Sequence, residues 1–344
     1  MRIPRLPHSR GGRLLLVVVL VLALATLVFW RGPDLAIVGR AFRAVRWEWV
    51  AAAVLINLFS VAVRAQAWRT VIRQAIPPPW PRRRVVFAAF CVGLLGNAAL
   101  PGRVGELARV AVITRHLRRR PGTWATVVGT VFAHRLFDVI AAVALVVYVL
   151  YAARIPDWAV PGLSIVIGIG VGLLVAGVLL ARRQHRPVSE GLGPVRRVLR
   201  MARHGLTVLR RPAPAVEALL FQLVGWTAQL FAVYTAFHAF HIDPSIPAAA
   251  LVLVIMNLVT VFPFWPGNVG LLQAAIALAL LSYGVAYAHG VAYGIGLQAI
   301  EVSVGVGLGL AFLAREGFSF AMLRRMPEVT DVELDEEARV ERIA

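Results

Sequence analysis

The chain has 344 residues, 59% of them hydrophobic, and its mean hydropathy of +0.76 is far above that of an average soluble domain. All 36 basic residues are arginine and they bring the net charge to +19, but they lie in short loops between apolar segments. Composition therefore excludes an ordinary soluble domain and argues against nucleic acid as a partner. It predicts an all-α polytopic protein of the cell membrane, with anionic lipid headgroups as counter-ions.

Six apolar segments are clear candidates for membrane-spanning helices, which need about 20 residues. They cover residues 14–30, 49–63, 124–151, 159–181, 215–237 and 291–313. The first is not followed by a small-x-small cleavage site, so we expect a helix of the mature protein rather than a secretory signal. We expect a transmembrane domain at residues 14–314, between a basic cytoplasmic N-terminus at residues 1–13 and a disordered cytoplasmic tail at residues 315–344.

Two further apolar regions are interrupted, because residues 85–100 run into PGRVGE and residues 248–283 contain FPFWPGNVG. If the first region crossed the membrane fully, the loop at residues 101–123, with its six arginines, would lie outside. Re-entrant hairpins instead leave most arginines inside, as the positive-inside rule requires. The sequence therefore predicts about six spanning helices plus two re-entrant helical hairpins, with both termini cytoplasmic. We expect residues 31–49, which stay outside, to form an amphipathic helix at the outer leaflet.

The two interruptions resemble each other. Residues 101–107 read PGRVGEL and residues 266–272 read PGNVGLL, a match of P-G-x-V-G-x-L at an offset of 165. The two halves, at about residues 49–151 and 215–313, would begin on opposite sides of the membrane, with the basic cytoplasmic arm of residues 182–213 between them. Inverted repeats with broken helices that meet near the midplane are the architecture of many secondary transporters.

The motif at residues 97–107 has a physical reason to lie at membrane depth. Non-helical backbone is tolerated there only where protein or a water-filled cavity surrounds it. Pro101 ends the first half-helix, the following glycines let the chain reverse, and the next helix N-terminus makes a partial positive site for an anion. Arg103 and Arg109 would add full charge to this site, and Glu106 would keep it from being purely cationic.

These residues resemble the membrane domain of lysylphosphatidylglycerol synthases and its stand-alone, flippase-like relatives. The family pattern of Asn, then P-x-R-x-G-E and a further Arg, is matched by Asn97, Pro101, Arg103, Gly105, Glu106 and Arg109. Its later Arg-x-x-Asp pair and P-G-x-x-G turn are matched by Arg135, Asp138, Pro266, Gly267 and Gly270. The sequence departs from the pattern at Gln273 and Gln298, which stand where the family often has a Glu and a basic residue.

The resemblance implies a module of two inverted halves that moves lipids between leaflets. In the two-domain relatives a cytoplasmic transferase makes the aminoacylated lipid. Because about 30 residues follow the last apolar segment here, too few for such a domain, we do not expect aminoacyl transfer.

Ionisable and polar residues inside apolar segments form the candidate path for a lipid headgroup. The path comprises Asn97, Pro101, Gly102, Arg103, Gly105, Glu106, Arg109, Arg135, Asp138, Pro266, Gly267, Gly270, Gln273, Gln298 and Glu301. Plainer interpretations stay open for several of them. Arg135 and Asp138 can simply neutralise each other, and Glu301 can be either a proton-coupling acid or a buried neutral group. Outside this list, Arg64, Gln222 and Gln229 are weaker candidates, because amides in membrane helices often just bond a neighbouring helix and Arg64 can snorkel to the inner interface.

The function that follows is a flippase or transporter for a phospholipid or lipid-linked headgroup. We expect no enzyme activity, cofactor or metal, because no P-loop, nucleophile elbow or metal-ligand spacing occurs. The expected partners are anionic or aminoacylated phospholipids. The alternative is a non-transporting subunit that presents lipid to a separately encoded glycosyl- or aminoacyl-transferase.

Overall fold

The computed structural model describes residues 34–99, 104–117, 123–155, 160–182, 208, 211–243, 245–261 and 266–315. In this part of the chain the regular structure consists of ten α-helices and a 3₁₀ turn, and it contains no strand. The apolar segment at residues 14–30, the first hairpin tip at residues 100–103, most of the basic arm and the tail at 316–344 lie outside the described residues.

Five helices are long and apolar enough to cross a membrane. They are α3 Trp47–Ala75, α6 Thr123–Ala152, α7 Val160–Arg182, α9 Pro212–Ala239 and α12 Tyr287–Arg315. Each coincides with one of the predicted spans or overlaps nearly all of it, so the chain is an all-helical, multi-pass membrane protein with five candidate spans among the described residues.

Helix α3 differs from its prediction, because the span expected at residues 49–63 continues as helix to Ala75. Hydropathy falls after residue 63, where arginine and glutamine become frequent. These polar side chains find partners on neighbouring helices. Arg64 bonds Asp138 of α6, for example, and Thr70 Oγ1 donates to Glu217 of α9. The helix ends only before residues 77–79, a run of three prolines.

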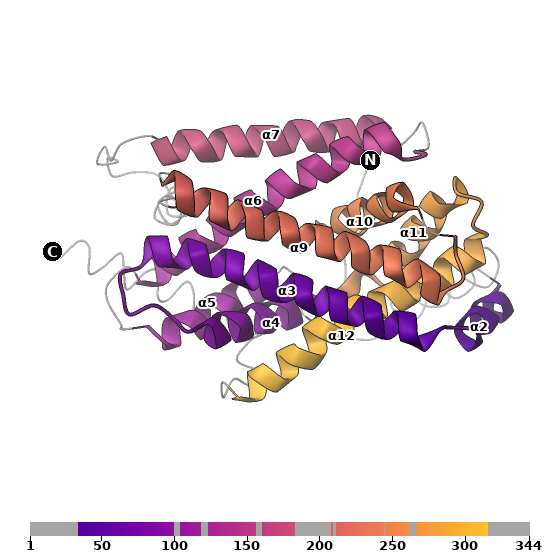
Figure 1. Ribbon diagram of the computed structural model, residues 1–344, viewed down its shortest axis with the longest axis horizontal. Coiled ribbons are helices and arrows are strands. Elements are labelled where there is room, and N and C mark those ends of the chain that lie inside the picture. Colours follow the sequence, from indigo (N-terminus) through magenta and orange to yellow (C-terminus); the bar gives the residue numbers. More distant parts are fainter. Residues whose placement is uncertain are drawn as a thin grey trace, which may run out of the picture.

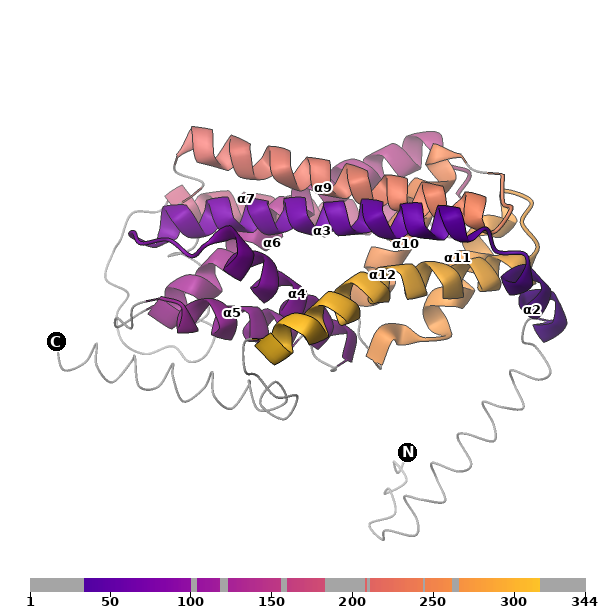
Figure 2. The same ribbon diagram turned by 60° about the horizontal axis from the view of Figure 1, so that its bottom comes forward.

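Two pairs of shorter helices form helical hairpins at the interrupted regions. They are α4 Arg83–Ala99 with α5 Gly105–Arg115, and α10 Ile246–Val261 with α11 Leu271–Leu281, the second pair joined through the 3₁₀ turn Pro266–Asn268. The longest, α4, has 17 residues and therefore spans about 25 Å, less than the hydrocarbon core of about 30 Å. The hairpins lie at opposite ends of the molecule, and α4 contacts the 3₁₀ turn of the second hairpin near the middle (Figures 1 and 2).

Helices α3 and α9 run antiparallel through the centre of the molecule (Figure 1). Contacts at both ends define this pairing, because Arg46 N donates to Ala239 O (3.1 Å) and Arg211 Nη1 donates to Gln74 Oε1 (3.3 Å). Helix α12 crosses below the pair and touches α4 as well as α11. Helix α7 lies at the edge and packs mainly against α6 (Figure 1).

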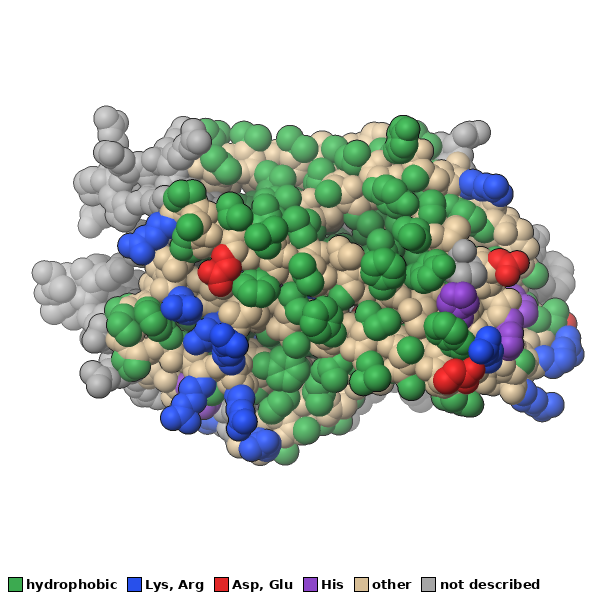
Figure 3. Space-filling view, in the orientation of Figure 1, with side chains coloured by type: hydrophobic (Ala, Val, Ile, Leu, Met, Phe, Trp, Pro, Cys, Tyr) green, Lys and Arg blue, Asp and Glu red, His purple; other side chains and the backbone are tan. Residues whose placement is uncertain are grey.

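Each hairpin has its own apolar core. Trp68, Phe90 and Ile113 belong to the core around α4 and α5, whereas Phe237 and Tyr293 belong to the core around α10 and α11. The short helix α2 Leu35–Arg43 is amphipathic, as the sequence predicted for residues 31–49. Its buried face packs against the second core. Figure 3 shows hydrophobic side chains across the middle of one face and several arginines at the end where α3 terminates.

Candidate functional site

The first turn of α5 and the middle of α6 hold a charged cluster. Glu106 forms an ion pair with Arg109 one turn later on α5, at 2.5 Å, and accepts a hydrogen bond from Arg135 Nη2 of α6. Arg135 Nη1 in turn donates to Asp138 Oδ2 at 3.1 Å. Both local pairs have the i, i+3 spacing that brings side chains together on one helix face. The Glu106–Arg135 contact joins them into one cluster.

The carboxylate of Asp138 connects three long helices, because it belongs to α6 and accepts hydrogen bonds from α3 and α9. Its Oδ1 accepts from Arg64 Nη2 of α3 (3.1 Å), from Trp226 Nε1 of α9 (3.0 Å) and from Gln222 Nε2 of α9. With Arg135, this carboxylate receives four donors while its side chain is 10% exposed. Such a set of donors offsets the desolvation of a buried charge.

From Arg64 the polar contacts continue to α12. Arg64 Nη1 donates to Gln229 Oε1 (3.1 Å), and Gln229 Nε2 donates to Glu301 Oε1 (3.3 Å). A continuous series of contacts therefore runs from Arg109 on α5 through α6, α3 and α9 to Glu301 on α12. We call it the polar path. Its members are Arg109, Glu106, Arg135, Asp138, Gln222, Trp226, Arg64, Gln229 and Glu301.

The expectation that Arg64 snorkels to the interface is wrong. Its side chain is 15% exposed, and both of its guanidinium bonds point into the molecule. The reason lies on α9, where Gly225 leaves room for the arginine stem, because a Cβ at this position would collide with Arg64 Cγ. The sequence marked Arg64, Gln222 and Gln229 only as weak candidates, and it held no signal for Trp226.

The arginines of the polar path differ in accessibility. Arg109, expected to contact a headgroup, is buried to 4% exposure and stacks over the rings of Trp68 (4.8 Å) and Phe90 (5.7 Å). The side chain of Arg135 instead keeps 40% of its surface exposed. Arg135 therefore has the most exposed side chain of the three arginines in the polar path.

The first hairpin is closed by a very tight approach of its two helices. A Cβ added to Gly105 would collide with the carbonyl oxygen of Gly93 and lie 2.6 Å from Asn97 Oδ1. That Asn97 oxygen is buried and has no hydrogen-bond partner among the described residues. Pro101, Gly102 and Arg103, which complete the predicted motif, lie outside them.

The second hairpin is closed by neutral groups. Gly267 and Gly270 have φ of 68° and 91°, in the left-handed region that glycine tolerates. Gln273 Oε1 accepts from Gly270 N (2.6 Å), and Gln273 Nε2 donates to Gln298 Oε1 of α12. Gln298 Nε2 then donates to Gly267 O. On α12, Gln298 thus bonds the hairpin, whereas Glu301 one turn later bonds Gln229 of α9.

The end of α4 and the turn of the second hairpin face a common cavity of about 520 Å³. Leu95, Ala98 and Ala99 line it from α4, Gly267 and Val269 line it from the second hairpin, and α12 provides the remaining wall. The lining is mostly apolar, with the Gln298 amide as a polar group. Among the described residues, no group of three His, Cys, Asp or Glu side chains is arranged to hold a metal ion.

Comparison with known proteins identifies a matching protein family. The family described as lysylphosphatidylglycerol synthase TM region matches residues 14–309 of this chain. A protein of Methanothermobacter thermautotrophicus, described as a UPF0104 membrane protein, is 25% identical over 284 residues, which are 77% of this chain and 82% of the relative. No solved structure matches the chain at a significant level.

Proposed function

Because the chain belongs to the lysylphosphatidylglycerol synthase TM region family, we propose that it is a lipid flippase, which moves a phospholipid headgroup between leaflets while the acyl chains stay in the bilayer. The polar path carries this proposal. Burying three arginines and three carboxylates in an apolar bundle is costly, and ionisable groups inside membrane proteins generally mark the route of a polar substrate.

The proposal includes two inverted halves, α3 to α6 and α9 to α12, with re-entrant hairpins. In an antiparallel pair of helices, equivalent positions of two repeats touch only near a symmetry axis. Ser60 Oγ donates to Gly225 O (2.7 Å) and Arg64 bonds Gln229 (3.1 Å), and the partners in both contacts are 165 residues apart. The same offset separates the two P-G-x-V-G-x-L motifs. These contacts support a pseudo-two-fold axis through the α3–α9 crossing, beside the polar path.

In the mechanism that we propose, the headgroup phosphate first meets the accessible Arg135. The phosphate competes with Glu106 for this guanidinium, and Glu106 keeps its ion pair with Arg109. Arginine pairs bidentately with phosphate as it does with carboxylate, so the exchange replaces one charge-assisted pair with another. The basic end of the molecule would be cytoplasmic, as the arginine distribution favours, so the headgroup would enter from the inner leaflet.

Glu301 would couple this movement to protons. With Glu301 ionised, three carboxylates balance the guanidiniums of Arg64, Arg109 and Arg135. Protonation of Glu301 leaves one excess positive charge, which matches one phosphate. Glu301→Gln mimics the protonated form, so we expect its transport rate to be the same with and without a proton gradient. A gradient dependence equal to that of the wild type would rule out this coupling.

Transport is tested with the purified full chain in liposomes, by following labelled phospholipids that differ only in headgroup. We expect headgroup-dependent movement that falls at least about tenfold in Arg135→Gln, which loses the charge-assisted bond to the phosphate. We expect a similar fall in Glu106→Gln, because the carboxylate that displaces the phosphate from Arg135 on release is then missing. Arg46→Gln is the matched control. Arg46 pairs with Glu48 outside the polar path, both side chains are largely exposed, and its rate should stay within about twofold of the wild type.

Two outcomes would contradict the proposal. If no headgroup moves faster than in protein-free liposomes, with and without a proton gradient, the chain is not a flippase under these conditions. Co-purification with a transferase would then test the rival role of presenting lipid to an enzyme. If the Glu106 and Arg135 variants lose transport only in proportion to their loss of folded protein, the polar path is structural.

A further inference from the structure

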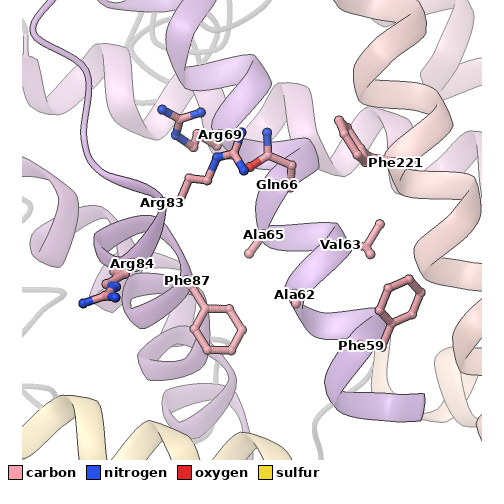
Figure 4. A pocket seen from close by; sticks show the side chains of 10 residues that line it. All are labelled: Phe59, Ala62, Val63, Ala65, Gln66, Arg69, Arg83, Arg84, Phe87 and Phe221. Atoms are coloured by element: carbon pink, nitrogen blue, oxygen red, sulfur yellow. The ribbon is translucent and has the colours of Figure 1, made fainter. Parts of the chain in front are cut away.

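A second cavity, separate from the polar path, opens on the side of the molecule between α3, α4 and α9. Its volume is about 460 Å³, within the range of small-molecule binding pockets. Figure 4 shows Arg69, Arg83 and Arg84 on one side of the cavity and Phe59 and Phe221 on the other, with Phe87 between them. The lining is therefore divided into an apolar part and a basic part.

The basic part is formed by Arg69 of α3 and by Arg83 and Arg84 at the start of α4. In Figure 4 the side chains of Arg69 and Arg83 approach each other beside Gln66. Arg69 Nε donates to Pro81 O at 3.4 Å, which holds its guanidinium at the mouth of the cavity. Among the described residues, no carboxylate forms an ion pair with any of these three guanidiniums.

Neighbouring residues of α4 do not supply a negative charge to balance these arginines. Arg83 and Arg84 lie in the first turn of α4, which contains no acidic residue. A helix N-terminus carries partial positive charge of its own, so two cations in this turn are unfavourable unless an anion lies nearby. The basic part of the cavity is therefore complementary to an anion.

The apolar part has the depth of one leaflet. Phe59 lies ten residues before Arg69 on α3, a separation of about 15 Å along the helix axis. Half of a hydrocarbon core of about 30 Å is the same length. The cavity is also open to the side, because Phe59 is 55% exposed and Ala62 is exposed on the outer face of α3. An acyl chain can therefore enter the cavity sideways from the surrounding bilayer, so the lipid does not have to leave the membrane.

We propose that this cavity binds one anionic phospholipid of the leaflet at the basic end of the molecule. The phosphate lies at Arg69, Arg83 and Arg84, and an acyl chain follows Ala62 and Phe87 towards Phe59. The site binds lipid whether or not the chain moves lipids between leaflets. Binding is therefore measured apart from transport, and failure of one proposal leaves the other intact.

The test is a titration of the purified full chain in detergent micelles with fluorescent phosphatidylglycerol, with phosphatidylcholine and inorganic phosphate as competitors. We expect phosphatidylglycerol to bind much more tightly than phosphatidylcholine, and phosphate to compete poorly because it lacks the acyl chain. Arg83→Gln/Arg84→Gln should weaken binding roughly 25-fold, about fivefold for each arginine. The matched control is Arg40→Gln/Arg43→Gln, which removes the same charge from exposed positions of α2 and should change binding less than about twofold.

A second pair of variants tests the acyl-chain part without changing charge. Ala62→Trp fills the cavity from an exposed position and should weaken binding about tenfold. Ala51→Trp adds the same volume three turns earlier on the same face of α3, outside the cavity lining, and should leave affinity unchanged.

Three results would overturn the site. Equal loss of affinity in the α2 and α4 arginine pairs would mean a general attraction of lipid to positive surface. Competition by inorganic phosphate as strong as that by unlabelled phosphatidylglycerol would mean an anion site without a lipid. Wild-type affinity in Ala62→Trp would mean that no acyl chain occupies the cavity.

Discussion

The two helical hairpins have the same shape and different chemistry. The α4–α5 hairpin carries Glu106 and Arg109, which join the polar path through Arg135. The α10–α11 hairpin is held by the neutral amides of Gln273 and Gln298. Residues of both hairpins line one cavity. A common scaffold thus presents a charged group on one side and an uncharged closure on the other, so we expect the first hairpin to bind the headgroup and the second to gate its exit.

The hairpins also use glycine for different physical reasons. Gly105 is needed because α4 and α5 approach so closely that no side chain fits between them. Gly270 has free space around its Cα but adopts a φ of 91°, which other residues rarely tolerate. The first hairpin is constrained by packing and the second by backbone conformation. Substitutions can therefore separate the two.

Asp138→Asn should have the largest effect on stability, because it removes a buried negative charge from the polar path, which the first hairpin joins. The variant keeps the shape of the side chain but leaves Arg64 and Arg135 without their common carboxylate. Removing one partner from a buried ion pair typically costs about 3 kcal/mol of unfolding free energy. Thermal or denaturant unfolding in detergent measures this loss. The control is Glu48→Gln, at an exposed ion pair, where we expect less than about 0.5 kcal/mol.

Gly105→Ala should have the next largest effect and should exceed Gly270→Ala. The added methyl group at Gly105 meets the backbone of Gly93, which cannot move unless the two helices separate, so we expect a loss of about 2–3 kcal/mol. At Gly270 only the strained backbone, with φ of 91° and ψ of −55°, opposes the change, so we expect about 1–2 kcal/mol. Unfolding of the two variants side by side is the measurement. Equal losses would show that packing does not distinguish the hairpins.

The sequence predicted the helices better than their contacts. Runs of apolar residues located the five described spans, and the interruptions at Pro-Gly motifs located both hairpins, because bilayer thickness and missing N–H groups act locally along the chain. The end of α3 was missed, since average hydropathy counts Arg64 and Arg69 as solvent-exposed, whereas one is paired inside the bundle and the other lines a cavity.

The candidate site was predicted in part for the same reason. Glu106 and Arg109, like Arg135 and Asp138, are close in sequence, so helix geometry alone brings each pair together. The contacts of Arg64 with Asp138 and Gln229 join residues 74 and 165 positions apart and depend on how whole helices pack. Composition also does not indicate that Arg109 is covered by Trp68. The offset of 165 between the two Pro-Gly motifs also separates Arg64 from Gln229, and it is the one signal in the sequence for this contact.

Gln298→Leu should have the smallest effect, and it tests the neutral side of the comparison. The substitution keeps the volume but removes the bonds from Gln298 to Gly267 and Gln273. Hydrogen bonds between membrane helices contribute about 0.6 kcal/mol on average and at most about 1.7 kcal/mol, so we expect a loss of about 1 kcal/mol. Ser303→Ala on the same helix is the control, because its bond to Ile300 is local to α12. A loss from Gln298→Leu as large as that from Asp138→Asn would mean that the amides hold the second hairpin as firmly as the charges hold the first. A hairpin held that firmly would open too rarely to act as the gate, and gating would then have to be sought in the first hairpin.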